Sequence, residues 1–167
     1  LMNVDLEFQH SVETLLYREA FYLDTRDWDA WLGLFAEDVD YWMPAWLSET
    51  ELATDPEMHL ALIHCESRED LEDRVFRIRT EDSLASTPLV RSCHVVGNVL
   101  VLARSEDEAT VAAAWTVHQY NTAKGGRVHG GRYEYRLRET PAGLVIAAKK
   151  IVFLNDAVDV PLDIYNV

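Results

Sequence analysis

The chain has 167 residues, of which 49% are apolar and 26% charged, and its formal net charge is −14. This length and balance predict one globular domain over residues 1–167 with a sizeable core. There is no apolar run of about 18 residues and no basic start before an apolar stretch, so we expect neither a membrane span nor a secretory signal. Because only 15 basic residues stand against 29 acidic ones, a nucleic-acid partner is excluded as well.

Two helices are predicted in the first 35 residues. Apolar side chains recur at helical spacing from about residue 5 to residue 23, and Asp5 is the expected N-cap. A second helix over 27–35 is indicated by four apolar residues on one side: Trp28, Trp31, Leu32 and Phe35. Asp24 or Thr25, in the turn before it, is the expected cap of this second helix.

The next segments alternate between extended and helical patterns. Residues 39–43 and 59–65 predict short strands, and the polar stretch 47–58 between them predicts a loop. A third helix over 67–80 is predicted from the capping residue Ser67 and an apolar stripe. Two ion pairs are expected on its surface: Asp70/Arg74 and Asp73/Arg77.

After Pro88 the apolar pattern changes to a period of two. Four antiparallel strands are predicted: 91–103, 110–121, 128–139 and 144–154. Gly97, Gly130 and Gly131 are expected to mark bulges or bends that curve the sheet. Helices followed by an antiparallel meander predict an α+β fold with the helices on one face.

The cysteines and histidines do not form a metal-binding pattern. Cys65 and Cys93 are the only cysteines, which predicts two reduced, buried thiols in a cytoplasmic protein. A Cys2His2 iron–sulfur cluster is disfavoured because the only local pairs are adjacent, His64 with Cys65 and Cys93 with His94, and neighbours on a strand point to opposite faces. We therefore predict no metal site and no cofactor in this chain.

Proton transfer inside the fold is the remaining enzymatic option. The candidate groups for such a cavity are His94, Asn98, His118, Asp24, Asp40 and Tyr17. His94 and Asn98 are expected on one face of their strand, and His94, Asp40 and Tyr17 in an apolar pocket would suit a stand-alone isomerase or dehydratase. The alternative, which we favour, is that Asp24 caps a helix while His94 and His118 are hydrogen-bonded core groups.

Two apolar segments fit either a core or a docking surface. They are Trp42-Met-Pro-Ala-Trp46 and the C-terminal residues 158–167. Trp, Tyr and Met are enriched at protein interfaces, which favours docking, but both segments would also close a core. Both interpretations stay open at this point.

Several long motifs, in order along nearly the whole chain, resemble the small (β) subunit of aromatic-ring-hydroxylating dioxygenases. The group acting on benzoate, toluate, anthranilate and halobenzoate is the most similar. The matching segments are Leu16-Tyr-Arg-Glu-Ala20, Asp27-Trp-Asp-Ala-Trp31, Tyr41-Trp-Met-Pro-Ala-Trp46, Leu71–Thr80, Thr87-Pro88, Arg91-Ser92-x-His94 and Asp163-Ile-Tyr165.

This resemblance implies a fold and a role. The fold is a nuclear-transport-factor-like (cystatin-like) cone, in which three helices pack on the concave face of a curved, mostly antiparallel sheet. The role is structural: such a subunit has no catalytic, cofactor-binding or metal-binding residues and assembles with a large (α) subunit, usually three of each. The large subunit holds a Rieske [2Fe-2S] cluster and a mononuclear non-haem iron. The complex dihydroxylates an aromatic ring with O2 and electrons that a reductase takes from NADH.

Overall fold

The computed structural model describes residues 5–80, 90–155 and 161–167. In these residues the helices are α1 (Leu6–Thr25), α2 (Trp28–Leu32) and α3 (Arg68–Arg79). The strands are β1 (Phe35–Pro44), β2 (Ala61–Cys65), β3 (Arg91–Arg104), β4 (Glu108–Asn121), β5 (Gly125–Thr140) and β6 (Gly143–Phe153), and a short 3-10 helix, η1 (Ile164–Asn166), follows. The motif Thr87-Pro88 lies outside the described residues.

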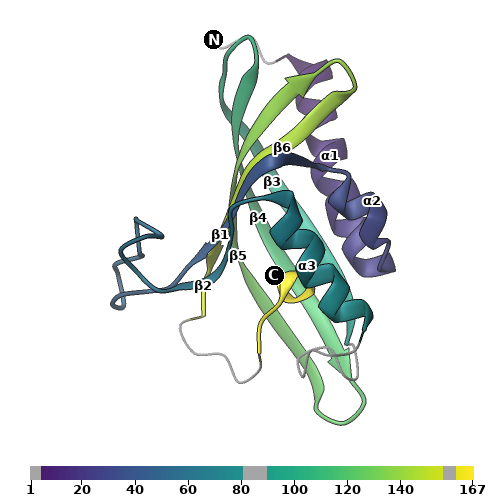
Figure 1. The fold of residues 1–167 in the computed structure, drawn as a ribbon, viewed down its shortest axis with the longest axis vertical. Helices are drawn as coiled ribbons and strands as arrows, with labels where there is room; N and C mark the ends of the chain where they lie inside the picture. Colours follow the sequence, from purple (N-terminus) through teal and green to yellow (C-terminus); the bar gives the residue numbers. More distant parts are fainter. Residues whose placement is uncertain (1–4, 81–89, 156–160) are drawn as a thin grey trace.

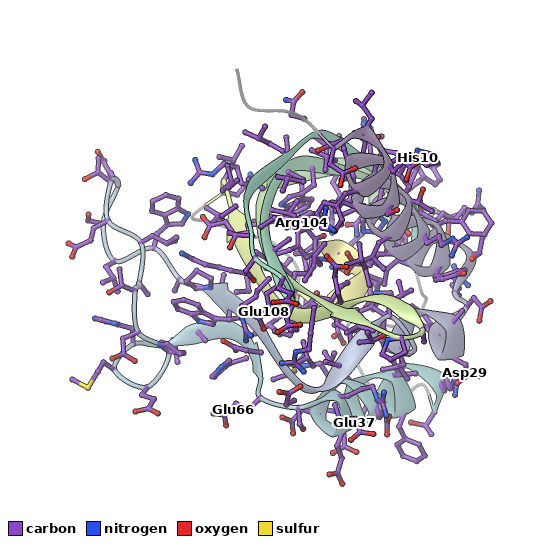
Figure 2. The ribbon with its side chains drawn as sticks, turned by 90° about the horizontal axis from the view of Figure 1, so that it is seen from above. His10, Asp29, Glu37, Glu66, Arg104 and Glu108 are labelled. Atoms are coloured by element: carbon purple, nitrogen blue, oxygen red, sulfur yellow. The ribbon has the colours of Figure 1, made fainter. Side chains whose placement is uncertain are left out.

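The six strands form one curved sheet with the order β2-β1-β6-β5-β4-β3 (Figure 1). All neighbouring strands are antiparallel except β1 and β6, which are parallel. The helices lie on one side of the sheet, and the strands curl round the interior when the molecule is viewed from above (Figure 2). The predicted α+β cone, with three helices on the concave face, is confirmed. No helix in the described part of the chain is long and apolar enough to cross a membrane.

The helix starts follow local capping chemistry. Asp5 accepts a hydrogen bond from the Phe8 amide at 3.1 Å, as predicted for the cap of α1. The predicted cap of α2 was wrong: Asp27, not Asp24 or Thr25, accepts from the Ala30 amide. Ser67 caps α3 as predicted.

Helix α2 is shorter than predicted. It ends at Leu32, and Phe35 already belongs to β1, where it pairs with Ile146 of β6. The apolar stripe of 28–35 is therefore shared between a helix and a strand. Pairing with the sheet decides the boundary, which helical periodicity alone does not reveal.

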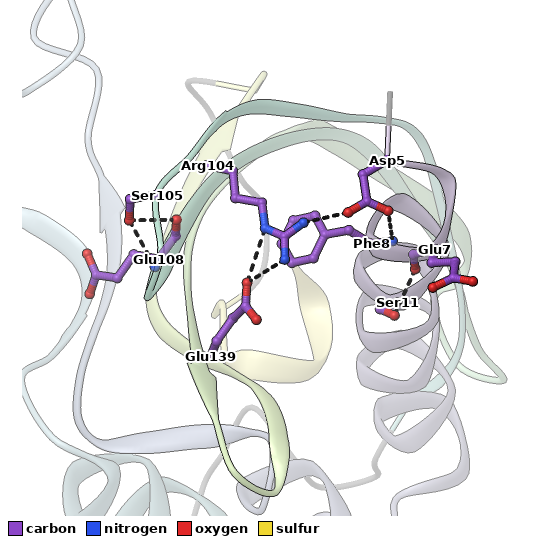
Figure 3. A network of polar contacts seen from close by, with 8 residues as sticks. All are labelled: Asp5, Glu7, Phe8, Ser11, Arg104, Ser105, Glu108 and Glu139. Atoms are coloured by element: carbon purple, nitrogen blue, oxygen red, sulfur yellow. Dashed lines mark hydrogen bonds and ion pairs between the residues drawn. The ribbon is translucent and has the colours of Figure 1, made fainter. Parts of the chain in front are cut away.

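Arg104, the last residue of β3, connects the start of α1 to the end of β5 (Figure 3). Its guanidinium donates to Asp5 at 2.7 Å and to Glu139 at 2.9 Å, and lies 3.6 Å from the centre of the Phe8 ring. One cation thus joins α1, β3 and β5. Contacts of α1 with β3 and β6 then keep the helix across the concave face.

The expected ion pairs along α3 do not form as predicted. Arg74 turns inward, where its Nε donates to Cys65 Sγ at 3.3 Å and its Nη1 to Asp163 at 3.3 Å. The Nε of Arg77 donates to the backbone carbonyl of Asp73 at 3.4 Å. Partners from other segments compete for these side chains, and spacing within a helix says nothing about them.

The four C-terminal strands were predicted closely, and their side chains alternate as expected. On β5, Tyr133, Tyr135 and Leu137 are buried while Arg132 and Arg136 face outward. This alternation places the aromatic core on the concave side.

The three glycines differ in their roles. The register of β3 and β4 shifts just after Gly97, which confirms a bulge there. Gly130 and Gly131 keep a regular register, so the predicted bulge was wrong for them. A Cβ on Gly131 would lie 1.9 Å from the Val152 carbonyl oxygen and 3.2 Å from Trp115 Nε1, so glycine is needed there for close packing.

The C-terminal residues 161–167 pack into the concave side. Ile164, Tyr165 and Val167 are at most 3% exposed. The Gln119 side chain on β4 donates to the Tyr165 carbonyl at 3.3 Å. For these residues the core interpretation is confirmed and docking was wrong, while 158–160 lie outside the described residues.

Candidate interaction surfaces and interior polar groups

An acid–histidine pair joins the end of α1 to the edge strand β3. Asp24 Oδ1 lies 2.6 Å from His94 Nδ1, and Asp24 Oδ2 accepts from the His94 amide at 2.8 Å. Ser92 Oγ donates to the same carboxylate at 3.0 Å. Burial raises the pKa of Asp24, but the hydrogen bonds from His94 and Ser92 outweigh it, so the net pKa lies below its ordinary value.

The histidine of this pair is buried, whereas the Asp24 side chain is 22% exposed. The His94 side chain is 1% exposed, and among the described atoms its Nε2 has no hydrogen-bond partner. A carboxylate on Nδ1 orients an imidazole as in proton-transfer sites. Here the second nitrogen faces packed protein, so the pair serves mainly to pin α1 to β3.

The other predicted acid–base residues do not converge on His94. Asp40 lies on the face away from the helices, 3.1 Å from His64 Nε2, and Tyr17 is 48% exposed on α1. Asn98 follows the bulge at Gly97 with φ 51° and is exposed, and His118 is exposed opposite Cys93. The predicted set of His94, Asp40 and Tyr17 was therefore wrong, and only Asp24 of the candidates reaches the histidine.

A buried ion pair lies deeper, between α1 and β6. Lys149 Nζ is 2.6 Å from Glu19 Oε1, and both side chains are at most 3% exposed. The Tyr135 hydroxyl donates to Glu19 at 2.8 Å, and Lys149 Nζ lies 4.0 Å from the centre of the Tyr133 ring. Burial lowers the pKa of Lys149, and the neighbouring Glu19 carboxylate offsets this only in part.

Sequence reasoning missed this pair, although a signal for it exists. Glu19 occupies the apolar side of α1, between Leu16 and Leu23, both of which are 2% exposed or less. Lys149 likewise points inward from β6, on the same side as the apolar Ile151 two residues later. A charged residue at a core position of each of two elements predicts a buried partner, because an isolated buried charge is costly.

The cysteine–histidine pairs diverge as predicted. His64 points outward to Asp40, whereas Cys65 is buried beside Arg74. Cys93 is exposed and His94 is buried. Burial of Cys93 was thus a wrong prediction, since it shares the outward side of β3.

These side chains do not fit an iron–sulfur cluster or a mononuclear iron. Within residues 5–80, 90–155 and 161–167, no three His, Cys, Asp or Glu side chains gather closely enough to hold a metal ion. The two cysteines also lie on opposite sides of the sheet, one buried and one exposed.

The outer face of the sheet, which points away from the helices, is charged over β5, β6, β1 and the start of β4. Ion pairs join different strands there: Arg136 of β5 with Glu108 of β4 at 2.8 Å, Arg138 of β5 with Asp38 of β1 at 2.9 Å, and Lys150 of β6 with Glu134 of β5 at 3.4 Å. We call these residues the charged ladder. Each charge already has a partner within the chain, which suits contact with water.

Over the middle of β3 and β4, at residues 95–102 and 112–116, the same outer face has no charged side chains. Leu100 pairs with Ala112, Val95 with Thr116 and Gly97 with Ala114, and Leu102 continues this side of β3. Val95, Leu100 and Leu102 are each 55% exposed or more. We call Val95, Leu100, Leu102, Ala112, Ala114 and Thr116 the uncharged face; a surface without charges is typical of the core of a protein interface.

Between β1 and β2, residues 45–60 form an arm that extends from the body of the molecule (Figure 1). Trp46 Nε1 anchors it by donating to the Phe153 carbonyl at 2.7 Å. Trp42 and Met43 are 8% exposed or less, so the docking interpretation was wrong for them.

Comparison with known proteins identifies the family. The family model for the ring hydroxylating beta subunit matches residues 18–160 of this chain. The 2-halobenzoate 1,2-dioxygenase small subunit of Burkholderia cepacia is 38% identical over 93% of this chain and 94% of its own length.

Two solved structures support the same assignment. The beta subunit of the benzoate 1,2-dioxygenase of Burkholderia mallei superposes with a TM-score of 0.78 at 33% identity, covering 93% of this chain and 95% of that one. A cystatin-like protein of unknown function from Nostoc punctiforme, at 16% identity, has a TM-score of 0.61 over 96% and 97% of the two chains, which shows a shared fold. The motifs, the cone and these matches together show that the chain belongs to the family of ring-hydroxylating dioxygenase β subunits.

Proposed function

We propose that this chain is the small subunit of the terminal oxygenase of an aromatic-ring-hydroxylating dioxygenase, and that its role is assembly. Membership of the β-subunit family supports the assignment. Relatives named for 2-halobenzoate and benzoate support an aromatic carboxylate as the substrate of the complex. The reaction would be cis-dihydroxylation of the ring with O2 and electrons from NADH.

The catalytic centre belongs, in this proposal, to a large α subunit. That subunit would hold the Rieske [2Fe-2S] cluster and the mononuclear iron, since the cysteine and histidine pairs of this chain diverge. Three large and three small subunits, a separate NADH-dependent reductase and a cytoplasmic location complete the proposal. Residues 1–167 would act as one domain with no catalytic, cofactor-binding or metal-binding residues of its own.

One observation supports assembly above the others, namely the uncharged face. In a chain with a net charge of −14, six neighbouring outward positions on β3 and β4 have no charge. Three of their apolar side chains are more than half exposed. Burying such a surface against another subunit removes apolar area from water, at about 25 cal/mol for each Å².

Purification with and without a large subunit of the same dioxygenase family tests the proposal. The chain alone should be colourless, free of iron and inactive. Co-expression should give a stable coloured complex that oxidises an aromatic carboxylate when reductase and NADH are added. Stoichiometric iron bound by the isolated chain, or a failure of the two subunits to co-purify, would contradict the proposal.

A further inference from the structure

The arm between β1 and β2, residues 45–60, is held by its own hydrogen bonds. Leu47 and Ser48 donate their amides to the Glu51 carbonyl at 2.8 and 3.3 Å, and Ala53 donates to the Ala45 carbonyl at 3.0 Å. Ser48 Oγ accepts from the Glu51 amide at 3.1 Å. Together with the Trp46 anchor, these bonds give the arm a defined shape before any partner is bound.

This arm exposes large apolar side chains to solvent. Met58 is 76% exposed and Leu60 82%, and Leu62, at the start of β2, is 43% exposed. Leu60 and Leu62 are two positions apart on extended chain, so they lie on the same side. Isolated apolar residues are common on surfaces, but three so close in sequence, two on the arm and one where it joins β2, indicate a contact.

The charge of the arm indicates what kind of partner it contacts. Residues 45–60 contain four carboxylates, Glu49, Glu51, Asp55 and Glu57, and no Lys or Arg. An apolar centre with an acidic rim fits a partner surface with an apolar pocket and a basic rim.

A second copy of this chain does not fit this description of the partner. Its net charge is also −14, so two acidic arms and bodies would repel each other at close range. We propose that the arm docks on the large subunit, with Met58 and Leu60 inserted into an apolar pocket rimmed by Lys and Arg. This inference rests on the proposed function and adds the surface through which the large subunit is held.

A pair of double variants tests the apolar part of the contact. M58S/L60S should weaken binding of the large subunit at least tenfold, measured by titrating labelled large subunit with purified small subunit. The matched control, F21S/F76S, removes two side chains of 61% and 64% exposure on α1 and α3 and should change binding less than twofold. Thermal unfolding of each isolated variant should match the wild type, which shows that the fold is intact.

The acidic rim is tested by E49K/E51K. This variant should bind the large subunit more slowly, and its association rate should depend less on salt than that of the wild type. Binding of M58S/L60S within twofold of the wild type, or equal losses in M58S/L60S and F21S/F76S, would overturn the assignment of the arm. An unchanged association rate and salt dependence of E49K/E51K would overturn the basic rim.

The same titration separates the two levels of the proposal. If wild-type small subunit does not bind the large subunit at all, the proposed function fails and the arm loses its partner. If the wild type binds and M58S/L60S binds equally well, the function stands and only the docking site is wrong. A complex between copies of this chain that M58S/L60S abolishes would assign the arm to the second copy and overturn the proposal.

Discussion

The two faces of the sheet hold charge in opposite ways. On the concave side, Glu19 and Lys149 form one ion pair that water does not reach. On the outer side, the charged ladder spreads several ion pairs over β5, β6 and β1, with Arg138 33% and Asp38 68% exposed. In both arrangements each of these charged groups has a partner of opposite charge. Only in the buried pair does the stability of the fold depend on keeping both partners. An exposed ion that loses its partner is still hydrated, whereas a buried one is not.

Removal of Glu19 should give the largest effect. Glu19→Ala leaves the Lys149 ammonium buried without a counter-ion and the Tyr135 hydroxyl without its acceptor. The expected loss is about 3–5 kcal/mol in the free energy of unfolding, measured by urea denaturation.

A double variant separates the lost pair from the lost volume. In E19M/K149M both charges are replaced by apolar side chains of similar length, and most of the stability lost in Glu19→Ala should return. A double variant as unstable as Glu19→Ala would show that packing, not the unpaired ammonium, causes the loss.

An intermediate effect is expected at the boundary between the two environments, where Asp24 is 22% exposed. Asp24→Asn should cost about 1–3 kcal/mol at neutral pH, because the charged hydrogen bonds to His94 and Ser92 are weakened. The folded-state pKa of Asp24 lies below its unfolded value, so its contribution is complete above about pH 4 and is lost as pH falls through the folded pKa. Unfolding curves of wild type and variant should therefore converge in acid; a constant difference down to pH 2 would exclude this linkage.

The smallest effect belongs to the charged ladder. Arg138→Ala removes the pairs with Asp38 and Glu108, yet all three groups contact water. The urea midpoint should shift little at low salt, and the difference should become smaller still in 1 M NaCl, where the Debye length falls to about 3 Å. A large shift that persists in high salt would mean that the outer ladder stabilises the fold in the same way as the interior pair.

Periodicity predicted most of the sheet and the long helices. The alternation of Tyr133, Tyr135 and Leu137 with charged residues fixed both the strand and its inward side. It failed between Trp28 and Phe35, where an apolar stripe suits a helix and a buried strand equally well. The parallel pairing of β1 with β6 was not predictable either, because it joins segments more than 100 residues apart.

Predictions about side-chain partners were less successful, for a similar reason. His94 was identified as a candidate, but its partner is Asp24 and not Asp40, because strand alternation turns Asp40 outward. The bulge after Gly97 turned Asn98 to the other side, and a single inserted residue of this kind has no clear sequence signature. Charged residues at core positions, Glu19 above all, were the overlooked signal.

The parallel pairing of β1 with β6 also affects the order in which the molecule can form. Tyr41 and Trp42 pair with Lys149 and Lys150. This pairing can therefore form only after β6, the last strand, has left the ribosome. Until then β1 has only the short β2 beside it, and its unpaired edge is exposed. Contacts so distant in sequence slow folding, so the nascent chain should remain a substrate for chaperones through most of its synthesis.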